Sequence, residues 1–268
     1  MEPAVRELPI PPRTLSRALP RALERHIAQI RTSPFESSRA PRPVERLPDG
    51  TISLVFRALG QRGDLTVIGA VSRALYKQTP GDLRVISVDF KLGGAYPFFG
   101  VPMQALADRL VPLEELWGTE ARGLLDRLLG CSDDAQAVDC LKQALAARLE
   151  RANHLELRSA MRAFHGIRRL VRQQHDLDVP GLAAGVGLSE RQLRRVFATA
   201  VGVGPKAYLR MLRFQRAIQS PELPGGELAI AAGYYDQAHL IAEFQHLARM
   251  TPRAFANRKQ PGATFAHY

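Results

Sequence analysis

The chain has little cysteine, and its first half contains a long stretch without histidine. Cys131 and Cys140 are the two cysteines among 268 residues, too few for a disulfide framework or a four-ligand zinc site built on cysteine. Residues 45–100 contain neither His nor Cys, and an enzyme that held a metal inside a small barrel would need histidines there. We therefore expect a reducing compartment, no metal and no cofactor.

Long apolar runs are also missing. No run of 18 apolar residues occurs, and the N-terminal MEPAVRELPIPPR lacks the apolar core of a signal peptide. The segment GAVSRALYK at 69–77 lacks the Gly-Lys-Ser/Thr ending of a phosphate-binding loop, and no Gly-x-Ser-x-Gly nucleophile turn is present. We expect a soluble, cytoplasmic protein that has no membrane partner and is not an enzyme.

Positive charge is abundant and unevenly distributed. The chain has 37 Lys and Arg against 26 Asp and Glu, a formal charge of +11. Residues 151–268 hold 17 basic and 8 acidic side chains, a net charge of +9, whereas residues 1–150 hold 20 and 18, a net charge of +2. A basic region attracts polyanions through the release of counterions, so this asymmetry favours a C-terminal part that binds nucleic acid.

One stretch of the basic part occurs twice. LAAGVGLSERQLRRVF, residues 182–197, returns as LAIAAGYYDQAHLIAEF, residues 228–244, at an offset of 46 residues that becomes 47 after the turn. Each copy has a short apolar helix, a glycine that tolerates positive φ, and a second helix that begins at a capping residue. The repeat predicts two helix-turn-helix units, and the segment from Pro205 predicts one helix that spaces them.

The second helix of the first unit is cationic on one side. Ser189 opens it and forms the Ser-x-x-Gln pattern of a capping box, while Leu193 and Phe197 lie on its apolar face. Arginines on the other face suit bidentate contact with guanine, or contact with phosphate. A merely solvated helix face is the alternative, and the position after a glycine turn in a repeated motif disfavours it. The candidate DNA-binding residues of this unit are Ser189, Arg191, Gln192, Arg194 and Arg195.

The second unit has different chemistry, because alanines stand at the positions of two of those arginines. Its capping residue is Asp236. Its candidate DNA-binding residues are Gln237, Ala238, His239 and Ala242. Glu243 would repel phosphate unless it accepts a hydrogen bond from a cytosine amine. We expect the first unit to supply most of the specificity and the second mainly to dock.

Over about residues 157–256 the chain resembles the AraC/XylS-type transcription regulators. The residues that carry the resemblance are the Gly187 turn, Leu193, Phe197, Pro205, Tyr208, Arg213, Ala217, the segment AAGYYDQAHLIAEF, Thr251, Pro252 and Phe255. The resemblance implies that the helices beginning at Ser189 and Asp236 enter successive major grooves of double-stranded DNA, about 34 Å apart. Members often have Arg where this chain has Ala242 and a basic residue where it has Gln245, so the chain departs from the pattern there.

Residues 45–131 carry strand signals. TISLVF, LTVIGAV and LRVISVDF are bounded by the turn-forming segments PDG, GQRGD and TPGD. Ile86, Val88 and Phe90 alternate with Ser87 and Asp89, as in a half-buried strand. Through LPDGTISLVF and VDFKLGGAYPFFGVP the segment resembles the sensor-like domain of one branch of these regulators, and the resemblance implies a cupin-like barrel.

A pocket for a small molecule is typically apolar with a few polar anchors. The candidate ligand-binding residues of the sensor-like domain are Arg84, Phe90, Tyr96 and Phe98. Packing in the core is the alternative for each of these aromatic side chains. The identity of the effector does not follow from these residues.

We expect an α+β protein of two domains, with a β-rich N-terminal domain and an all-α C-terminal domain. The expected division is a proline-rich arm at 1–44, the β-rich domain at 45–131, a linker helix at 132–156, the double helix-turn-helix domain at 157–258 and a tail at 259–268. Within the arm, Leu19 to Ile30 has the spacing of a short helix. The linker helix serves dimerisation or is the last helix of the sensor.

The sequence thus predicts a sequence-specific regulator of transcription that binds promoter DNA and is controlled by a small-molecule effector or by homodimerisation. The resemblance implies action on RNA polymerase. One alternative is a DNA-targeted enzyme such as an alkylation-repair methyltransferase, which needs a reactive cysteine. Cys131 in Gly-Cys-Ser and Cys140 in Asp-Cys-Leu lack the neighbouring His or Arg that activates a thiol. The other alternative is a ligand-independent architectural DNA binder.

Overall fold

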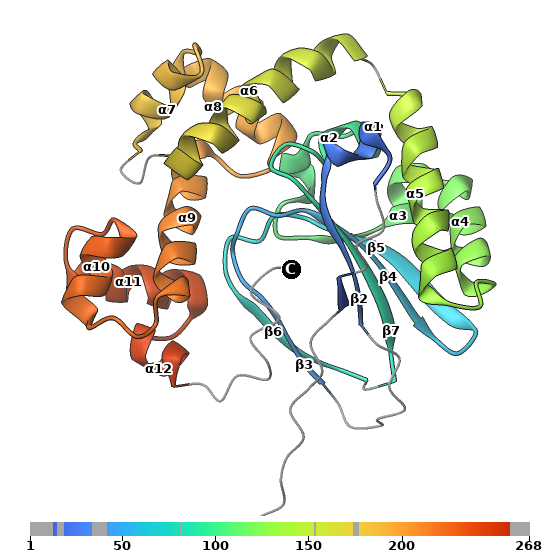
Figure 1. Ribbon diagram of the computed structural model, residues 1–268, viewed down its shortest axis with the longest axis horizontal. Coiled ribbons are helices and arrows are strands. Elements are labelled where there is room, and N and C mark those ends of the chain that lie inside the picture. The colour runs from blue at the N-terminus through green and yellow to red at the C-terminus, as the bar shows by residue number, and fades with distance from the viewer. Residues whose placement is uncertain are drawn as a thin grey trace, which may run out of the picture.

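A computed structural model shows a β-sheet region followed by a helical region (Figure 1). The residues that the structure describes are 13–14, 19–33, 42–80, 82–152, 154–173 and 177–257. The expected tail at 259–268 lies outside them, as does most of the expected arm before residue 19. None of the described helices is long and apolar enough to cross a membrane.

The N-terminal region is built on antiparallel strands. Six of them form one sheet in the order β1-β2-β7-β4-β5-β8, and β3 pairs separately with β6. The β-rich class is confirmed, but in the described residues the strands form these two sheets and no closed barrel, so the expected barrel is wrong in that respect. The strands are β1 (Arg13–Thr14), β2 (Ile27–Ser33), β3 (Arg42–Arg46), β4 (Ser53–Leu59), β5 (Arg62–Ile68), β6 (Leu75–Thr79), β7 (Arg84–Phe90) and β8 (Leu110–Pro112).

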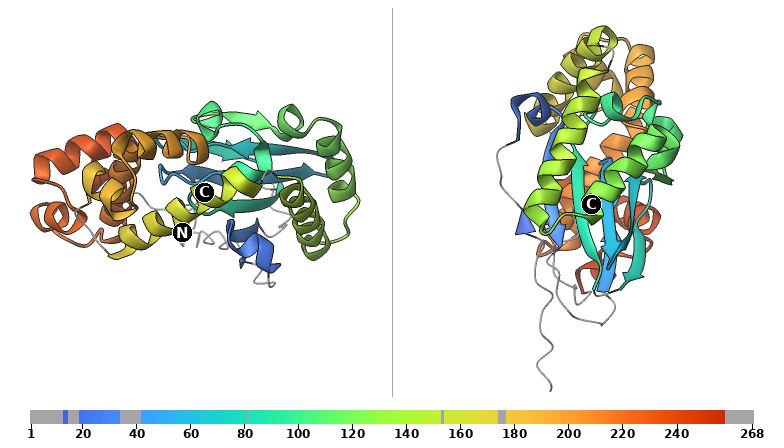
Figure 2. Two further views of the ribbon diagram at one scale, coloured as in Figure 1. Left: turned by 90° about the horizontal axis from the view of Figure 1, so that it is seen from above. Right: turned by 90° about the vertical axis from the view of Figure 1, so that its right-hand side faces the viewer.

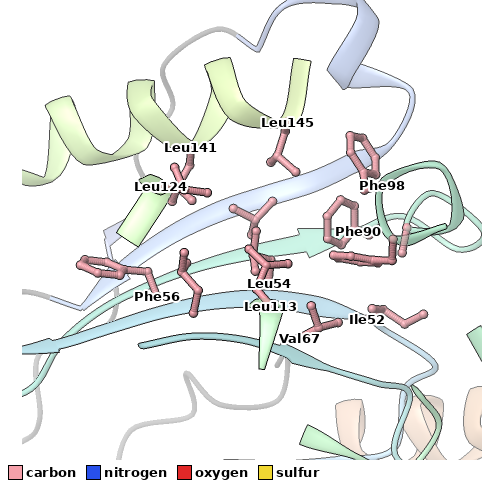
Figure 3. Packing of buried hydrophobic residues seen from close by; sticks show 14 of the residues in the cluster. Ile52, Leu54, Phe56, Val67, Phe90, Phe98, Leu113, Leu124, Leu141 and Leu145 are labelled. Carbon is pink, nitrogen blue, oxygen red and sulfur yellow. The ribbon is translucent and has the colours of Figure 1, made fainter. Parts of the chain in front are cut away.

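Helices cover one face of the six-stranded sheet. Figure 3 shows Leu124 and Leu141 on two of these helices pointing toward Leu54 and Phe56 on the sheet, and all four side chains are buried. Burying such side chains stabilises the region by about 1.5–3 kcal/mol each. The helices of this region are α1 (Arg21–Glu24), α2 (Tyr96–Phe99), the 3-10 helix η1 (Met103–Leu106), α3 (Leu113–Trp117), α4 (Thr119–Leu129) and α5 (Asp134–Glu150).

Helix α5, expected as a linker helix over 132–156, belongs to the N-terminal core. Its apolar residues, Val138 and Leu145 among them, are buried in the same cluster as the sheet. The helix is capped by Asp133, whose side chain accepts from the backbone N–H of Gln136 at 2.8 Å. Of the two roles that the sequence left open, the structure has α5 as the last helix of the sensor-like region.

Strand β2 replaces the short helix expected from Leu19 to Ile30. Only Arg21–Glu24 is helical, and Ile27–Ser33 pairs with β7 inside the sheet, so the expected arm ends well before residue 44. The register shifts between Ile27 and Gln29, which marks a bulge. The bulge puts Ile27 and Ile30 on the same buried face although they are three residues apart. That spacing is typical of a helix, and for this reason the sequence pattern predicted a helix where the structure has a strand.

The face of the sheet opposite the helices holds buried polar groups. Asp89 on β7 accepts from Arg31 at 2.5 Å and from Ser53 at 2.7 Å, and Ser87 donates to it at 2.9 Å. Asp89 and Ser87 are 2% and 1% exposed, so the expectation of a half-buried strand is wrong. The alternation of apolar and polar residues is real, but the polar face packs on polar partners and not on solvent. Hydrogen bonds and an ion pair offset the cost of burying these groups.

The C-terminal region consists of helices alone among the residues described. It forms two groups of helices joined by helix α9, and lies beside the sheet region (Figure 2). The helices are α6 (His154–Gln173), α7 (Val179–Gly185), α8 (Glu190–Ala200), α9 (Pro205–Gln219), α10 (Gly225–Ala232), α11 (Gln237–Ala248) and α12 (Pro252–Ala256).

The two regions contact each other at the start of β6. The backbone N–H of Ala74 donates to the carbonyl of Leu247 at 2.7 Å, and the Tyr76 hydroxyl donates to the carbonyl of Ala248 at 2.9 Å. Both acceptors lie in the last turn of α11, whose carbonyls have no partner within the helix. The N-terminal region therefore completes the C-terminal end of α11.

A second contact joins the turn before β4 to α9. The side-chain amide of Gln215 donates to the carbonyl of Pro48 at 3.0 Å in a buried position. Gly50 has φ +75°, and a Cβ built on it would lie 3.0 Å from the ring of Tyr208. Only glycine therefore fits at this point. The sensor-like region therefore contacts α9, the helix that joins the two helix-turn-helix units.

Candidate DNA-binding interface

The first helix-turn-helix unit has the local geometry that its sequence predicts. Helix α7 begins after Asp178, whose side chain accepts from the backbone N–H of Gly181 at 2.7 Å. The turn to α8 has Gly187 at φ +67°, the left-handed conformation that glycine adopts without strain. Leu182 of α7 and Leu193 of α8 are fully buried in one cluster. This packing fixes the direction of α8.

Ser189 and Gln192 close the N-terminal end of α8. The Ser189 hydroxyl accepts from the backbone N–H of Gln192 at 3.3 Å, and the Gln192 side chain accepts from the backbone N–H of Ser189 at 2.9 Å. This capping box was predicted and is confirmed. Both residues were also candidates for DNA contact, and in the free protein their side chains hold each other and the helix end.

The exposed side of α8 carries the three arginines. Arg191, Arg194 and Arg195 are all exposed, on the side of the helix away from the buried Leu193 and Phe197. Arg194 forms an ion pair with Glu190 one turn earlier at 2.5 Å. Neither Arg191 nor Arg195 has an ion-pair partner among the residues that the structure describes. Two guanidinium groups on this helix are therefore free to bind an external anion or a base edge.

The second unit has the same construction and a neutral surface. Gly233 has φ +82° in the turn, and Asp236 accepts from the backbone N–H of His239 at 2.7 Å at the start of α11. Leu240 and Phe244 are buried, so α11 is oriented like α8 with respect to its own core. The four exposed candidates on α11 are Gln237, Ala238, His239 and Ala242.

Glu243 does not lie on the exposed face of α11. Its carboxylate accepts two hydrogen bonds from the Arg210 guanidinium on α9, both at 2.9 Å, and its side chain is 13% exposed. These bonds raise the pKa of Arg210. The expected repulsion between Glu243 and phosphate is thus neutralised. The 47-residue offset already indicated this position, because it aligns Glu243 with Val196 on the partly buried edge of α8.

Helix α9 packs on both units. Near its start the Tyr208 ring lies 5.6 Å from the ring of Phe197 in α8, and near its end the Phe214 ring lies 4.9 Å from that of Phe244 in α11. Contacts of this kind contribute about 0.5–1.5 kcal/mol beyond the area they bury. Arg210 lies between the two aromatic contacts and adds the ion pair with Glu243. The two exposed helix faces are therefore held at a fixed separation.

The four ligand candidates do not converge in the sensor-like region. Arg84 forms an ion pair with Asp134 at 2.8 Å at one end of β7, whereas Phe90 is at the other end of that strand. The rings of Phe90 and Phe98 lie 5.1 Å apart and both are buried, and Tyr96 is partly buried beside them. The described residues also contain no group of His, Cys, Asp and Glu that could hold a metal ion.

Two known families match separate parts of the chain. Residues 182–258 match a family described as a helix-turn-helix domain, which covers α8 and α11. Residues 17–112 match a domain of unknown function, DUF6597, which covers most of the sheet. The second match begins before the expected start of the β-rich domain at residue 45, in agreement with the position of β2.

Curated relatives match only part of the chain. Over 87 residues it is 39% identical to the probable bifunctional transcriptional activator/DNA repair enzyme AlkA of two strains of Mycobacterium tuberculosis. The match involves 30% of this chain, and the chain spans 17% of the length of those relatives. The activities of the whole relatives therefore do not pass to this chain by similarity alone.

Among solved structures the chain is similar to ToxT from Vibrio cholerae. One crystal structure gives a TM-score of 0.41 at 7% identity, with 81% of this chain and 96% of ToxT covered. A second, of ToxT with an unsaturated fatty acid bound, gives a TM-score of 0.42 at 10% identity over 83% and 96% of the two chains. Likeness at this level is too weak to pass on a ligand.

Proposed function

We propose that the chain is a transcription regulator of the AraC/XylS type, which binds promoter DNA by placing α8 and α11 in successive major grooves. The observation that carries the proposal is the exposed face of α8, where Arg191 and Arg195 have no ion-pair partner among the described residues. Free guanidinium groups on a helix of this kind suit guanine edges and phosphates. The net charge of +9 over residues 151–268 adds attraction to the DNA backbone.

The sensor-like region controls this binding. It holds α9 through Gln215 and Tyr208 and the end of α11 through Tyr76, so a change in its structure is transmitted directly to both helix-turn-helix units. A small-molecule effector or a second copy of the chain would supply that change. RNA polymerase is the further partner through which bound protein would alter transcription. An effector can be sought by screening metabolites against the purified chain. An effector should shift both the thermal unfolding midpoint of the chain and its affinity for DNA.

The chemistry of Cys131 does not support an alkyl-transfer enzyme. Burial raises the pKa of the Cys131 thiol and the nearby Cys140 raises it further, and the opposing effect of the Arg84 cation is smaller. A thiol that accepts an alkyl group needs the opposite, a pKa lowered by cationic neighbours. The Cys131 thiol donates to the carbonyl of Arg127 at 3.2 Å, a contact within its own helix end.

The test is capture of genomic DNA fragments by the purified full chain at physiological salt, followed by sequencing. The proposal expects a shared motif that the variant Arg191→Ala/Arg195→Ala loses. Arg62→Ala/Arg127→Ala removes the same charge at exposed positions of the sheet region and should keep the motif. Motif-free binding that falls steeply with salt and is weakened equally by both variants would overturn the proposal.

A further inference from the structure

The exposed face of α11 is uncharged, unlike that of α8. Glu243 is the one acidic residue of α11, and Arg210 holds it away from the face. The helix contains no Lys or Arg, so it cannot bind guanine through a guanidinium group. The 47-residue offset puts Ala238, Ala242 and Gln245 at the positions of Arg191, Arg195 and Ala198, in the centre of the exposed face.

Two of the polar candidates on α11 are exposed but also contact neighbouring residues of the protein. The Gln237 amide lies against the backbone of Gly225 in α10, so closely that a Cβ at that glycine would come within 2.6 Å of it. The His239 ring packs edge-on against Tyr234 with ring centres 5.3 Å apart. Two exposed methyl groups, from Ala238 and Ala242, one exposed amide, from Gln245, and the exposed imidazole of His246 complete the face.

We infer that the two helices recognise different bases, with α8 contacting guanines and α11 contacting A·T pairs. The inference rests on the proposed function. Alanine has nothing beyond Cβ, so the helix can approach closely and place its methyl groups against thymine C5-methyl groups. Gln245 can bind adenine N6 and N7 with its amide. The operator is therefore asymmetric, with a G·C-rich half-site and an A·T-rich half-site about one helical turn apart.

The first experiment uses the unmodified full chain and changes only the DNA. Thymine is replaced by uracil, which lacks the C5-methyl group, at one position at a time in the captured motif. Each contacted thymine should weaken binding about fourfold, the equivalent of one buried methyl group. The loss of affinity should be confined to the half-site that α11 contacts. That half-site is identified as the one whose base preference is unchanged in the α8 variant Arg195→Ala. Equal binding to thymine and uracil throughout that half-site would overturn the inference.

The second experiment transfers the guanine preference to α11. Ala242→Arg introduces the side chain that α8 has at the aligned Arg195, and selection from randomised DNA should then give guanine in the second half-site. The expected discrimination is about 5- to 150-fold over other bases, the range of a bidentate arginine contact. Ala231→Arg adds the same charge at an exposed position of α10 and should leave the base preference unchanged.

The outcomes separate the two proposals. Failure of the unmodified chain to select any motif would contradict the proposed function itself. A motif with guanines in both half-sites, or one in which Ala242→Arg changes nothing while the variant keeps its thermal unfolding midpoint, would overturn the inference and leave the proposed function standing. Loss of folding in Ala242→Arg leaves the uracil experiment decisive, because that experiment uses the natural protein.

Discussion

At the scale of single residues, the pair Arg210 and Glu243 connects α9 to α11 at a point where the sequence suggested electrostatic repulsion from DNA. The two side chains are 29% and 13% exposed and share two hydrogen bonds. A partly buried bidentate pair is stronger than an exposed one. A double-mutant cycle of Arg210→Ala and Glu243→Gln should give a coupling free energy of about 1–3 kcal/mol in chemical unfolding.

The matched control for this cycle is Arg122 with Glu114. These side chains form an ion pair at 2.8 Å but are 63% and 54% exposed. Their coupling should not exceed about 1 kcal/mol. Equal coupling in the two cycles would show that the Arg210–Glu243 pair does not fix the orientation of α11.

Asp49 makes the stability of the protein depend on pH. Burial raises its pKa, and the nearby Arg46 offsets this only in part. A raised carboxyl pKa adds stability below its ordinary value of 3.8, and that stability is lost as the pH rises through the value in the folded protein. Asp49→Asn, which keeps an acceptor for the backbone N–H of Thr51, should therefore unfold at a higher temperature at neutral pH.

The thermal unfolding midpoints of Asp49→Asn and the unmodified chain should converge as the pH falls below 3.8, where the carboxyl group is protonated in both states. Asp126→Asn, at an exposed position on α4, is the control and should have little effect at any pH. A lower midpoint for Asp49→Asn at neutral pH would mean that the ion attraction to Arg46 outweighs the cost of burial.

At the scale of elements, the capping box at the start of α8 links a sequence signal to the orientation of the proposed recognition helix. Ser189→Ala removes the acceptor of the Gln192 N–H and should lower the free energy of unfolding by about 1 kcal/mol. Ser132→Ala is the control, because the residue that caps α5 is Asp133 and not Ser132. Equal losses in the two variants, measured by urea unfolding, would contradict the role given to the cap.

Local signals decided how well each element could be predicted. The glycine turns at 187 and 233 and the caps at Ser189 and Asp236 act within a few residues, so the double helix-turn-helix region followed from the sequence. Strand β2 did not follow, because its bulge imitates helical spacing. The short strands β3 and β6 also carried no signal, since their pattern is largely polar.

Contacts between distant parts of the chain could not be predicted from the sequence. The Arg210–Glu243 pair joins residues 33 apart, and the Gln215–Pro48 hydrogen bond joins residues 167 apart. Neither pairing follows from local periodicity, because many other charged or amide side chains could have been the partner in each contact. The arginines of α8 were predictable as exposed, but which of them is free and which is paired with Glu190 required the structure.

At the scale of the whole molecule, the turn at Gly50 joins the sensor-like region to α9. Gly50→Ala introduces strain at positive φ, about 1–2 kcal/mol, and a Cβ only 3.0 Å from the Tyr208 ring. Gly60→Ala has similar strain at φ +61° and no atom within 4 Å of the new Cβ. Gly50→Ala should therefore lower the free energy of unfolding more than Gly60→Ala. Equal losses would show that the Tyr208 ring does not pack closely enough on the turn at Gly50 to exclude a side chain there.

In the proposed complex one chain places α8 and α11 on one face of DNA, at a separation that α9 fixes. The most direct test is the affinity of the unmodified chain for its captured motif with base pairs inserted between the half-sites. Inserting about 5 or about 10 base pairs, a half or a whole turn, should reduce the affinity to that for DNA that holds the α8 half-site alone, because α9 cannot lengthen. Full affinity after either insertion would show instead that each helix binds DNA independently of the other.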